Sequence, residues 1–234
     1  MAHEWLPSLL TELFEHHCSE DLNQLSSQLL HSERSASEMA VSEMVDVGIE
    51  HSTAKAERWD SSSCVLISYA DTVSAEDQPG LRCLQALLHS HFNGLSSVVH
   101  VLPFLRATSD GGFAVASHEE IDQRFGDWND LAALGEGRQL MADLVLNHVS
   151  ASHPWVRAFL KGDQPRARCV LAASPNPCWD NVVRPRSSAL FTTLSTDRGP
   201  ETVWTTFGSD QVDVNWRESD VLLGFSRLRD LFCS

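Results

Sequence analysis

The 234-residue sequence has few positive charges and none of the common cofactor or metal motifs. Lys and Arg number 17 against 32 Asp and Glu, and a formal net charge of −15 excludes a surface that attracts nucleic acid or anionic membrane. No two of the six cysteines form a Cys-x-x-Cys pair, which zinc-ribbon and thioredoxin-like sites require. A Gly-x-Gly-x-x-Gly loop, a phosphate-loop lysine motif, a Gly-x-Ser-x-Gly elbow and a His-Glu-x-x-His pair are also lacking. We therefore expect no cofactor and no metal site.

The amino-terminal residues lack a basic segment followed by an apolar stretch, as a secretory leader would have. No run approaches the roughly 18 apolar residues that a membrane helix needs. A composition of 42% hydrophobic and 21% charged residues is that of a globular protein, which argues against wholesale disorder. We expect a cytoplasmic chain with reduced thiols, and disulfides remain the alternative.

Residues 1–60 differ in charge from the rest of the chain. They hold 12 acidic and 3 basic residues, so −9 of the net −15 lies in this first quarter. Apolar residues recur at helical spacing from Leu9 to about Ile49, which predicts two or three acidic helices. Such an extension would serve either as a docking or oligomerisation arm or as an appendage packed on the main domain.

Residues 61–149 alternate between short apolar runs and helical patterns. The runs are typical of strands buried on both faces, and they cover Cys64–Tyr69, Val98–Leu102 and Leu140–Leu146. Between them, helical spacing covers Gln78–Phe92 and Trp128–Gly137. This order predicts an α/β fold with a parallel sheet.

The alternation ends at Ser150. Residues 150–206 contain six prolines and no long periodic stretch, which predicts a loop-rich insertion. A strand at Gln211–Asn215 and a helix at Asp220–Phe232 are expected to follow it. Basic residues exceed acidic ones by six to two between positions 157 and 186, and this excess indicates either an anion site or a solvated loop face. The six are Arg157, Lys161, Arg166, Arg168, Arg184 and Arg186.

Polar residues that follow the predicted strands are the first candidates for a site, because ligands of parallel α/β proteins bind at the carboxyl ends of strands. His148 follows the third run and is either a ligand contact or a structural histidine. Asp110 and Phe113 lie on a glycine turn after the second run, and an acid beside an aromatic ring suits a sugar. A glycine turn capped by Asp is the alternative. Asp143 falls inside the third run, so we expect it to be partly buried, hydrogen-bonded to loop backbone and structural.

Several segments, taken in order, resemble glycoside hydrolase family 13, the α-amylase superfamily, and within it the branch that contains sucrose phosphorylase and glucosylglycerate phosphorylase. The superfamily signatures are matched by Asp143-Leu-Val-Leu-Asn147-His148-Val-Ser150 and Phe207-Gly-Ser-Asp210-Gln211-Val-Asp213-Val-Asn215. The branch is indicated by Val98–Phe104, Ser109–Phe113, Arg124–Trp128 and Val183–Arg186. The resemblance extends from about Trp59 to Phe225.

The resemblance implies an incomplete (β/α)₈ TIM barrel. Its first three βα units would occupy residues 61–149, a domain B-like insertion residues 150–215, and a truncated helix before the fourth strand residues 216–234, after a helical extension at 1–60. The activity of the branch is the retaining phosphorolysis of an α-glucoside, such as sucrose or glucosylglycerate, to glucose 1-phosphate. A small-molecule glucoside and inorganic phosphate are thus the implied partners, with no nucleic acid and no membrane.

The resemblance also assigns roles to individual residues. Contacts to the glucosyl unit and acceptor are implied for Asp110, Phe113, His148, Phe207 and Gln211. Arg186 would contact phosphate. Asp143 and Asn147 would form the structural rim of the site.

No catalytic residue can be assigned by the resemblance. The family's nucleophile is an Asp in an Arg-x-Asp context, and no carboxylate after His148 has this setting. The general acid Glu would come later still. We therefore expect an amino-terminal fragment that is inactive alone, with a complementing carboxyl-terminal fragment as a further partner. The alternatives are a non-catalytic sugar-binding or scaffold protein derived from such a barrel, and an unrelated small α/β binding domain.

Overall fold

The computed structural model describes residues 63–173, 179, 182–183 and 186–225. The chain divides into two units, one of residues 55–214 and one of residues 1–54 with 215–234. In the described part of the latter, a helix begins at residue 219, and the rings of Trp216 and Phe225 stack with centroids 5.1 Å apart. The predicted acidic helices of residues 1–60 lie outside the described residues, as does the predicted helix beyond residue 225. No helix in the described ranges has the length and apolar character to cross a membrane.

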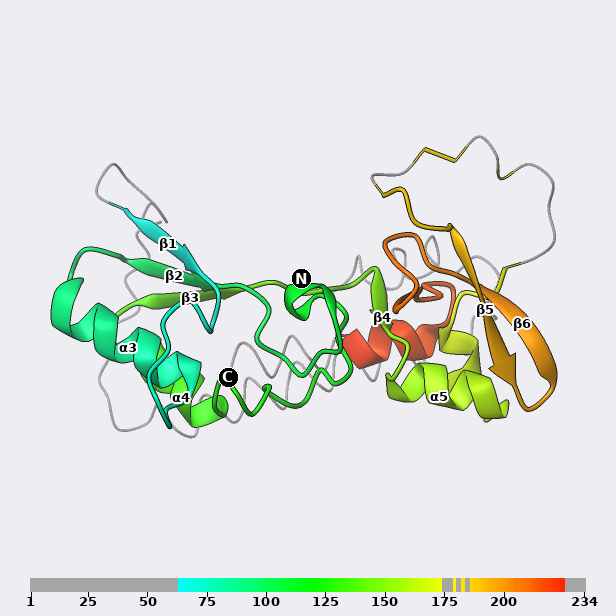
Figure 1. Cartoon of the computed structure of the whole chain (residues 1–234), viewed down its shortest axis with the longest axis horizontal. Coiled ribbons are helices and arrows are strands. Elements are labelled where there is room, and N and C mark those ends of the chain that lie inside the picture. Colours follow the sequence, from blue (N-terminus) through cyan, green and yellow to red (C-terminus); the bar gives the residue numbers. More distant parts are fainter. Residues whose placement is uncertain (1–62, 174–178, 180–181, 184–185, 226–234) are drawn as a thin grey trace, which may run out of the picture. The chain divides into compact units, whose positions relative to one another are not determined.

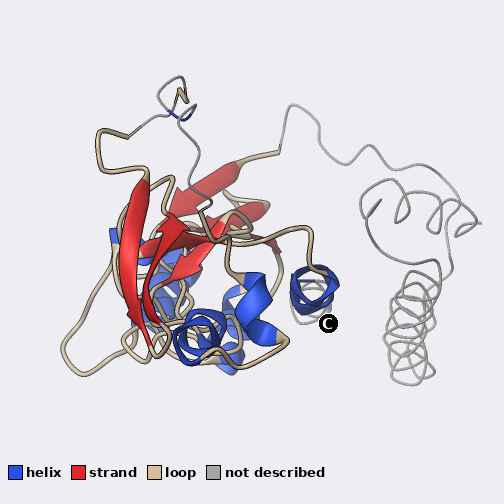
Figure 2. Cartoon of the chain, turned by 90° about the vertical axis from the view of Figure 1, so that its right-hand side faces the viewer, coloured by secondary structure: helices blue, strands red, loops and turns tan. Residues whose placement is uncertain are grey.

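A three-stranded parallel sheet organises the first half of the unit 55–214. Its strands β1 (Val65–Ser68), β2 (Val98–Val101) and β3 (Gln139–Ala142) lie in the order β1-β2-β3. The helices α3 (Gly80–His91) and α4 (Trp128–Leu134) connect them and lie side by side (Figure 1). Figure 2 shows the chain from the right-hand side of Figure 1, with strands in red and helices in blue. The predicted alternation of strand and helix is therefore confirmed.

One face of this sheet is covered by the two helices. The Leu81, Leu84 and Leu88 side chains recur at helical spacing in α3 and are buried. Val99 and Val101 point to the same face of β2, and both are completely inaccessible to solvent. Burial of such side chains stabilises a fold by about 1.5–3 kcal/mol each, so this layer supplies much of the core.

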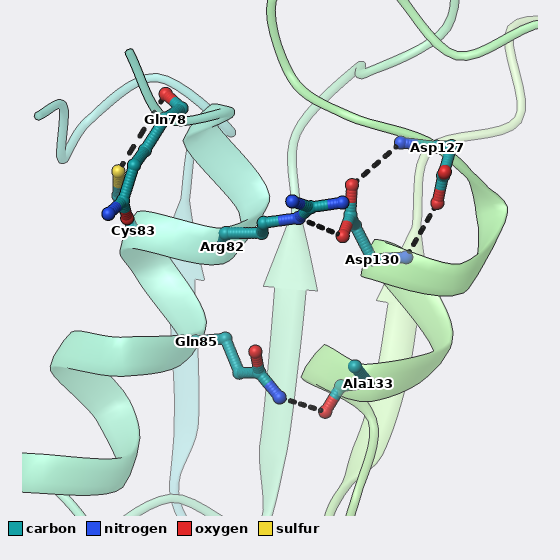
Figure 3. Close-up of polar contacts among 7 residues, drawn as sticks. All are labelled: Gln78, Arg82, Cys83, Gln85, Asp127, Asp130 and Ala133. Atoms are coloured by element: carbon teal, nitrogen blue, oxygen red, sulfur yellow. Dashed lines mark hydrogen bonds and ion pairs between the residues drawn. The ribbon is translucent and has the colours of Figure 1, made fainter. Parts of the chain in front are cut away.

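Polar contacts fix α4 against α3 (Figure 3). The Asp127 side chain accepts from the Asp130 amide at 3.0 Å, and Asp130 accepts from the Asp127 amide at 3.1 Å, which forms a capping box at the start of α4. The other Asp130 oxygen accepts from Arg82 Nε of α3 at 2.5 Å. One turn further along α3, Gln85 donates to the Ala133 carbonyl at 3.1 Å. The carboxylate of Asp130 therefore joins a helix cap to a helix–helix contact.

On the opposite face of the sheet the outer strands β1 and β3 are exposed, which corrects the prediction that they are buried on both faces. The central strand β2 fits the prediction, since Val98 on this face is only 5% exposed. Val65, Ile67 and Met141 project to this face and are 44%, 61% and 38% exposed. The described residues place no second layer over them, although parallel sheets are normally covered on both sides. An apolar run alone does not reveal which face has a covering layer.

The insertion, which the sequence predicts to be loop-rich, also contains short regular elements. The insertion contains α5 (Pro154–Lys161) and an antiparallel hairpin of β5 (Phe191–Thr196) and β6 (Gly199–Trp204). Pro154 is the first residue of α5, where its missing N–H costs nothing, so this proline starts a helix instead of preventing one. Both features are too short for their periodicity to be recognised in the sequence.

A pair of short antiparallel strands closes the insertion. β4 (His148–Ser150) pairs with β7 (Gln211–Asp213), so residues 148 and 213 are opposite each other. β7 confirms the strand predicted there. The third predicted run, Leu140–Leu146, is a strand only in its first part, because β3 ends at Ala142 and residues 143–146 belong to no strand.

Candidate functional site

A cavity of about 790 Å³ lies where the chain leaves the carboxyl ends of the parallel strands. It is lined by residues that follow β1, β2 and β3 and by residues of the insertion. All eight site residues predicted from the sequence line it, namely Asp110, Phe113, Asp143, Asn147, His148, Arg186, Phe207 and Gln211. The structure thus brings together positions that are up to 101 residues apart in sequence. Their individual roles stay predictions.

His148 is the most buried titratable side chain of the cavity, with 4% of its surface exposed. Its Nε2 atom lies 3.1 Å from the Phe113 carbonyl oxygen and 3.1 Å from Gln211 Nε2. The carbonyl requires a donor and the amide N–H requires an acceptor, so one proton position on Nε2 satisfies only one of these neighbours. The Nδ1 atom is buried without a hydrogen-bond partner in the described part of the chain.

Burial keeps the imidazole of His148 neutral. Desolvation lowers its pKa below the usual value, and the Phe113 carbonyl and the nearby Asp213 and Asp110 carboxylates only partly oppose this effect. A neutral imidazole offers one donor and one acceptor, which is the complement that a sugar hydroxyl needs.

Asp110 is presented to the cavity by an unusual backbone turn. It begins the 3₁₀ turn η2 (Asp110–Gly112) with a φ of 55°, in the left-handed region that side-chain-bearing residues rarely adopt. Gly112 has a φ of 103°, and a Cβ there would come within 2.6 Å of the Pro103 carbonyl oxygen. The glycine is therefore required for the turn that places the Asp110 carboxylate.

Two side chains of the insertion contact this carboxylate. Gln211 Nε2 donates to Asp110 Oδ2 at 2.9 Å, and the Arg186 guanidinium lies 3.6 Å from the same oxygen. Gln211 thus links Asp110 to His148 in one polar cluster. The Arg186 side chain remains 50% exposed, which leaves donors available to an anion in the cavity.

Aromatic rings form the apolar part of the cavity wall. The Phe207 ring lies 4.8 Å from the His148 ring at 45°, and Phe113 is the second predicted ring. Tyr69 was not predicted, although it directly follows β1, and its 43% exposure makes it available to a ligand. An exposed aromatic residue at the carboxyl end of a strand is the signal that would have identified it.

Asp143 is partly buried as predicted, but its hydrogen-bond partner differs from the prediction. Asp143 lies beyond the end of β3, and its partner is a side chain, His100 Nε2 at 3.2 Å, instead of loop backbone. The reason is that His100 of β2 pairs with Met141 of β3, so Asp143, two residues further along, lies near His100 on the same face of the sheet. Asn147 is exposed, and its backbone carbonyl accepts a hydrogen bond from the Val214 amide at 3.1 Å.

Two further carboxylates support the site and were not assigned from the sequence. Asp210 accepts from the Thr108 and Ser109 hydroxyls, both at 2.6 Å, which ties the turn before Asp110 to the end of the insertion. Asp213 accepts hydrogen bonds from the amide and the hydroxyl of Thr206. Burial raises the pKa of Asp213 above its usual value, and these hydrogen bonds only partly oppose the effect. Both residues lie within the second signature segment, so the motif marked them without indicating what they contact.

The carboxylates of the cluster are oriented by neighbouring side chains and offer acceptors to a bound polyol. Asp110 is engaged by Gln211 and Arg186, and Asp143 by His100. Retaining transfer between sugars requires one carboxylate as nucleophile and a second, protonated one as acid. In the described ranges no group of three or more His, Cys, Asp or Glu side chains is arranged to hold a metal ion.

No family model matches the chain, but it is similar to curated enzymes over most of its length. It is 40% identical to the glucosylglycerate phosphorylase of Allomeiothermus silvanus over 165 residues, which cover 70% of this chain and 30% of the relative. It is 34% identical to the sucrose phosphorylase of Agrobacterium vitis over 182 residues, covering 73% and 37%. The chain therefore spans about a third of the length of the curated relatives that it matches.

Solved structures agree with this relationship. The sucrose 6F-phosphate phosphorylase from Thermoanaerobacter thermosaccharolyticum superposes with a TM-score of 0.65 and 25% identity, over 71% of this chain and 36% of that one. The structural neighbours are TIM-barrel enzymes of glycoside hydrolase family 13. The resemblance stated from the sequence is confirmed: the chain is related to the amino-terminal part of the family 13 glucosylglycerate and sucrose phosphorylases.

Proposed function

We propose that this chain, as a relative of the amino-terminal part of family 13 phosphorylases, binds the glucosyl unit of an α-glucoside in the cavity around His148. The observation that carries the proposal is the linked cluster of Asp110, Gln211 and His148 beside aromatic rings that line the cavity. Carboxylate and amide groups hydrogen-bond sugar hydroxyls, and ring faces pack on the C–H face of a pyranose. The 790 Å³ volume is within the usual range for small-molecule sites.

Phosphate would bind at Arg186. This guanidinium is half exposed and is oriented by Asp110, so it has donors free for a second anion at the edge of the sugar cavity. Sucrose and glucosylglycerate are the substrates named for the relatives, and an enzyme of this branch would pass the glucosyl unit to phosphate.

We also propose that the chain does not perform this transfer by itself and contributes three βα units and the insertion of an incomplete barrel. The transfer needs a nucleophilic carboxylate and a second, protonated one. The two carboxylates that line the cavity, Asp110 and Asp143, do not lie in the Arg-x-Asp context of the family's nucleophile. A complementing carboxyl-terminal part would supply that pair.

Calorimetric titration with sucrose, glucosylglycerate and galactose tests sugar binding. We expect the two glucosides to bind and galactose to bind at least about tenfold more weakly, because a buried polar cluster is left unpaired by the wrong hydroxyl arrangement. The variants His148→Gln and Gln211→Ala should weaken glucoside binding by about tenfold or more, since each removes a hydrogen bond in a buried site. Thr193→Ala, on the exposed strand β5, is the matched control and should bind like the unaltered chain.

The outcomes separate the hypotheses. Failure of both glucosides to bind, with the fold intact by circular dichroism, would refute the glucosyl site. Glucoside binding that is indifferent to phosphate and to Arg186→Gln would support a non-catalytic sugar-binding protein. Formation of glucose 1-phosphate from sucrose and phosphate by the purified chain would overturn the proposed inactivity.

A further inference from the structure

A second cavity, of about 400 Å³, lies in the insertion between one side of α5 and the segment that follows this helix. It shares no lining residue with the glucosyl cavity. Three of its lining side chains are cationic, Arg157, Lys161 and Arg166, and Asp163 is its single carboxylate. Four of the six basic residues noted in the sequence thus line the two cavities, with Arg186 at the first cavity and these three residues at the second.

The three cationic side chains lie on two helical elements, α5 and the 3₁₀ helix that follows it. Arg157 and Lys161 are one helical turn apart, so their side chains leave the same side of α5 with Cβ atoms about 5–6 Å apart. Gly162 ends the helix with a φ of 74°, and its amide returns to the Ala158 and Phe159 carbonyls. This reversal carries the chain into η3 (Arg166–Cys169), which begins at the third cation.

Buried apolar side chains anchor α5 and η3 to the rest of the insertion. Val156, Ala158 and Phe159 of α5 and Ala167 and Cys169 of η3 are all buried. The Ala167 amide donates to the Asp163 carbonyl at 2.9 Å, which closes the turn between the two elements. The cations therefore project from packed elements and not from a mobile loop.

In the described part of the chain no carboxylate pairs with these three charges. Among the described residues, Arg157, Lys161 and Arg166 form no ion pair, whereas other arginines have carboxylate partners. Arginines with such partners are Arg82, Arg106, Arg124, Arg186 and Arg198. The cavity lining has a net charge of +2 in a chain with a net charge of −15, since three cations face one carboxylate.

We propose that this cavity is a second anion site that binds a phosphate dianion, either inorganic phosphate or the phosphate group of a sugar monoester. Guanidinium groups bind phosphate oxygens in bidentate fashion, and an ammonium group adds a point charge. The Asp163 carboxylate can accept a hydrogen bond from a hydroxyl of the ligand or from the protonated oxygen of inorganic phosphate. The cavity is large enough for a hexose phosphate.

Calorimetric titration at constant ionic strength tests the proposal with four probes: inorganic phosphate, glucose 6-phosphate, sulfate and acetate. We expect phosphate or the monoester to bind and acetate not to bind. In the double variant Arg157→Gln/Arg166→Gln, the dissociation constant of this site should rise by about a hundredfold, about tenfold for each charged hydrogen bond removed. Arg157→Lys/Arg166→Lys should keep part of the affinity, and Arg138→Gln, a basic residue outside both cavities, should keep all of it.

The Arg186→Gln variant separates this site from the glucosyl site. Phosphate binding that persists in Arg186→Gln and disappears in the double Gln variant supports the second site. Binding that disappears in Arg186→Gln and persists in the double variant overturns it and leaves the proposed function intact. Equal binding of all four probes would reduce the effect to diffuse charge attraction and would also overturn it. Tighter binding of glucose 6-phosphate than of inorganic phosphate would identify the monoester as the ligand.

Discussion

Acid should destabilise the fold through two buried histidines, His118 and His153. Their side chains are 7% and 6% exposed, and their rings meet edge to face with centroids 5.4 Å apart. Burial lowers the pKa of His118 to about 4, and burial with the neighbouring charges of His118 and Arg157 lowers that of His153 to about 3. Both rings are therefore neutral in the folded chain at neutral pH.

The direction of the effect follows from proton binding in the two states. Above the unfolded pKa of about 6.5 neither state binds protons at these rings, so they cost nothing. As the pH falls below that value the unfolded chain binds protons and the folded chain does not, which favours unfolding. Between pH about 7 and about 5, each ring should lower the free energy of unfolding by about 2 kcal/mol, and the pair by about 4 kcal/mol.

His153 adds a local consequence. Its Nδ1 atom accepts from the Trp155 amide at 3.2 Å and so caps the start of α5. A proton on Nδ1 removes that acceptor, so α5 should be the first element to lose protection of its amides in acid.

Urea unfolding at a series of pH values, followed by tryptophan fluorescence, measures the effect. His118→Phe removes one titrating ring, and His153→Asn removes the other while keeping a side chain that can cap a helix. The double variant should lose about 4 kcal/mol less stability than the unaltered chain between pH about 7 and about 5. His89→Gln, an exposed histidine of α3, is the control and should change nothing. An equal loss in the double variant and in the unaltered chain would refute the argument.

Three further predictions concern the α3–α4 contact, the turn at Gly112 and the exposed face of the sheet. Asp130→Asn should lower the free energy of unfolding by about 1–3 kcal/mol, because the capping box and the Arg82 ion pair both need the carboxylate; chemical denaturation measures it, and no change would contradict this role. Gly112→Ala should lower the free energy of unfolding by roughly 2 kcal/mol or more, because its Cβ would clash with the Pro103 backbone. Gly137→Ala, also at positive φ but in open space, should lower it by only roughly 1 kcal/mol, and equal losses would refute the steric argument. The purified chain should bind a hydrophobic dye at the exposed sheet face, and Ile67→Ser should reduce the fluorescence; an unchanged signal would place dye binding elsewhere.

The parallel sheet was predictable because local pattern and tertiary context agree there. The apolar run of β2 predicts a strand whose side chains are buried, and β2 is the central strand with neighbours on both sides. The same kind of run in β1 is largely exposed, because exposure depends on layers that the run itself does not encode. Sequence patterns thus locate strands better than they predict their surroundings.

The sequence predicted which residues line the cavity but not which of them hydrogen-bond each other. Signature segments placed His148 and Gln211 in it, but their shared hydrogen bond depends on the β4–β7 register. The His100 contact of Asp143 depends in the same way on the pairing of β2 with β3. Contacts between distant segments require the strand order, which a single sequence does not supply.

The short β4–β7 pair also bears on how the specificity of such a chain can change. Ser150 lies opposite Gln211, so the two ends of the insertion are held together at its base. Those residues of the insertion that neither line the cavity nor hold the Asp110 turn can then vary in length and sequence while the cluster of Asp110, Gln211 and His148 keeps its geometry. Variation at those positions would change the surroundings of a bound ligand without rebuilding the polar cluster, so the β4–β7 pair separates a variable part of the insertion from a constant one.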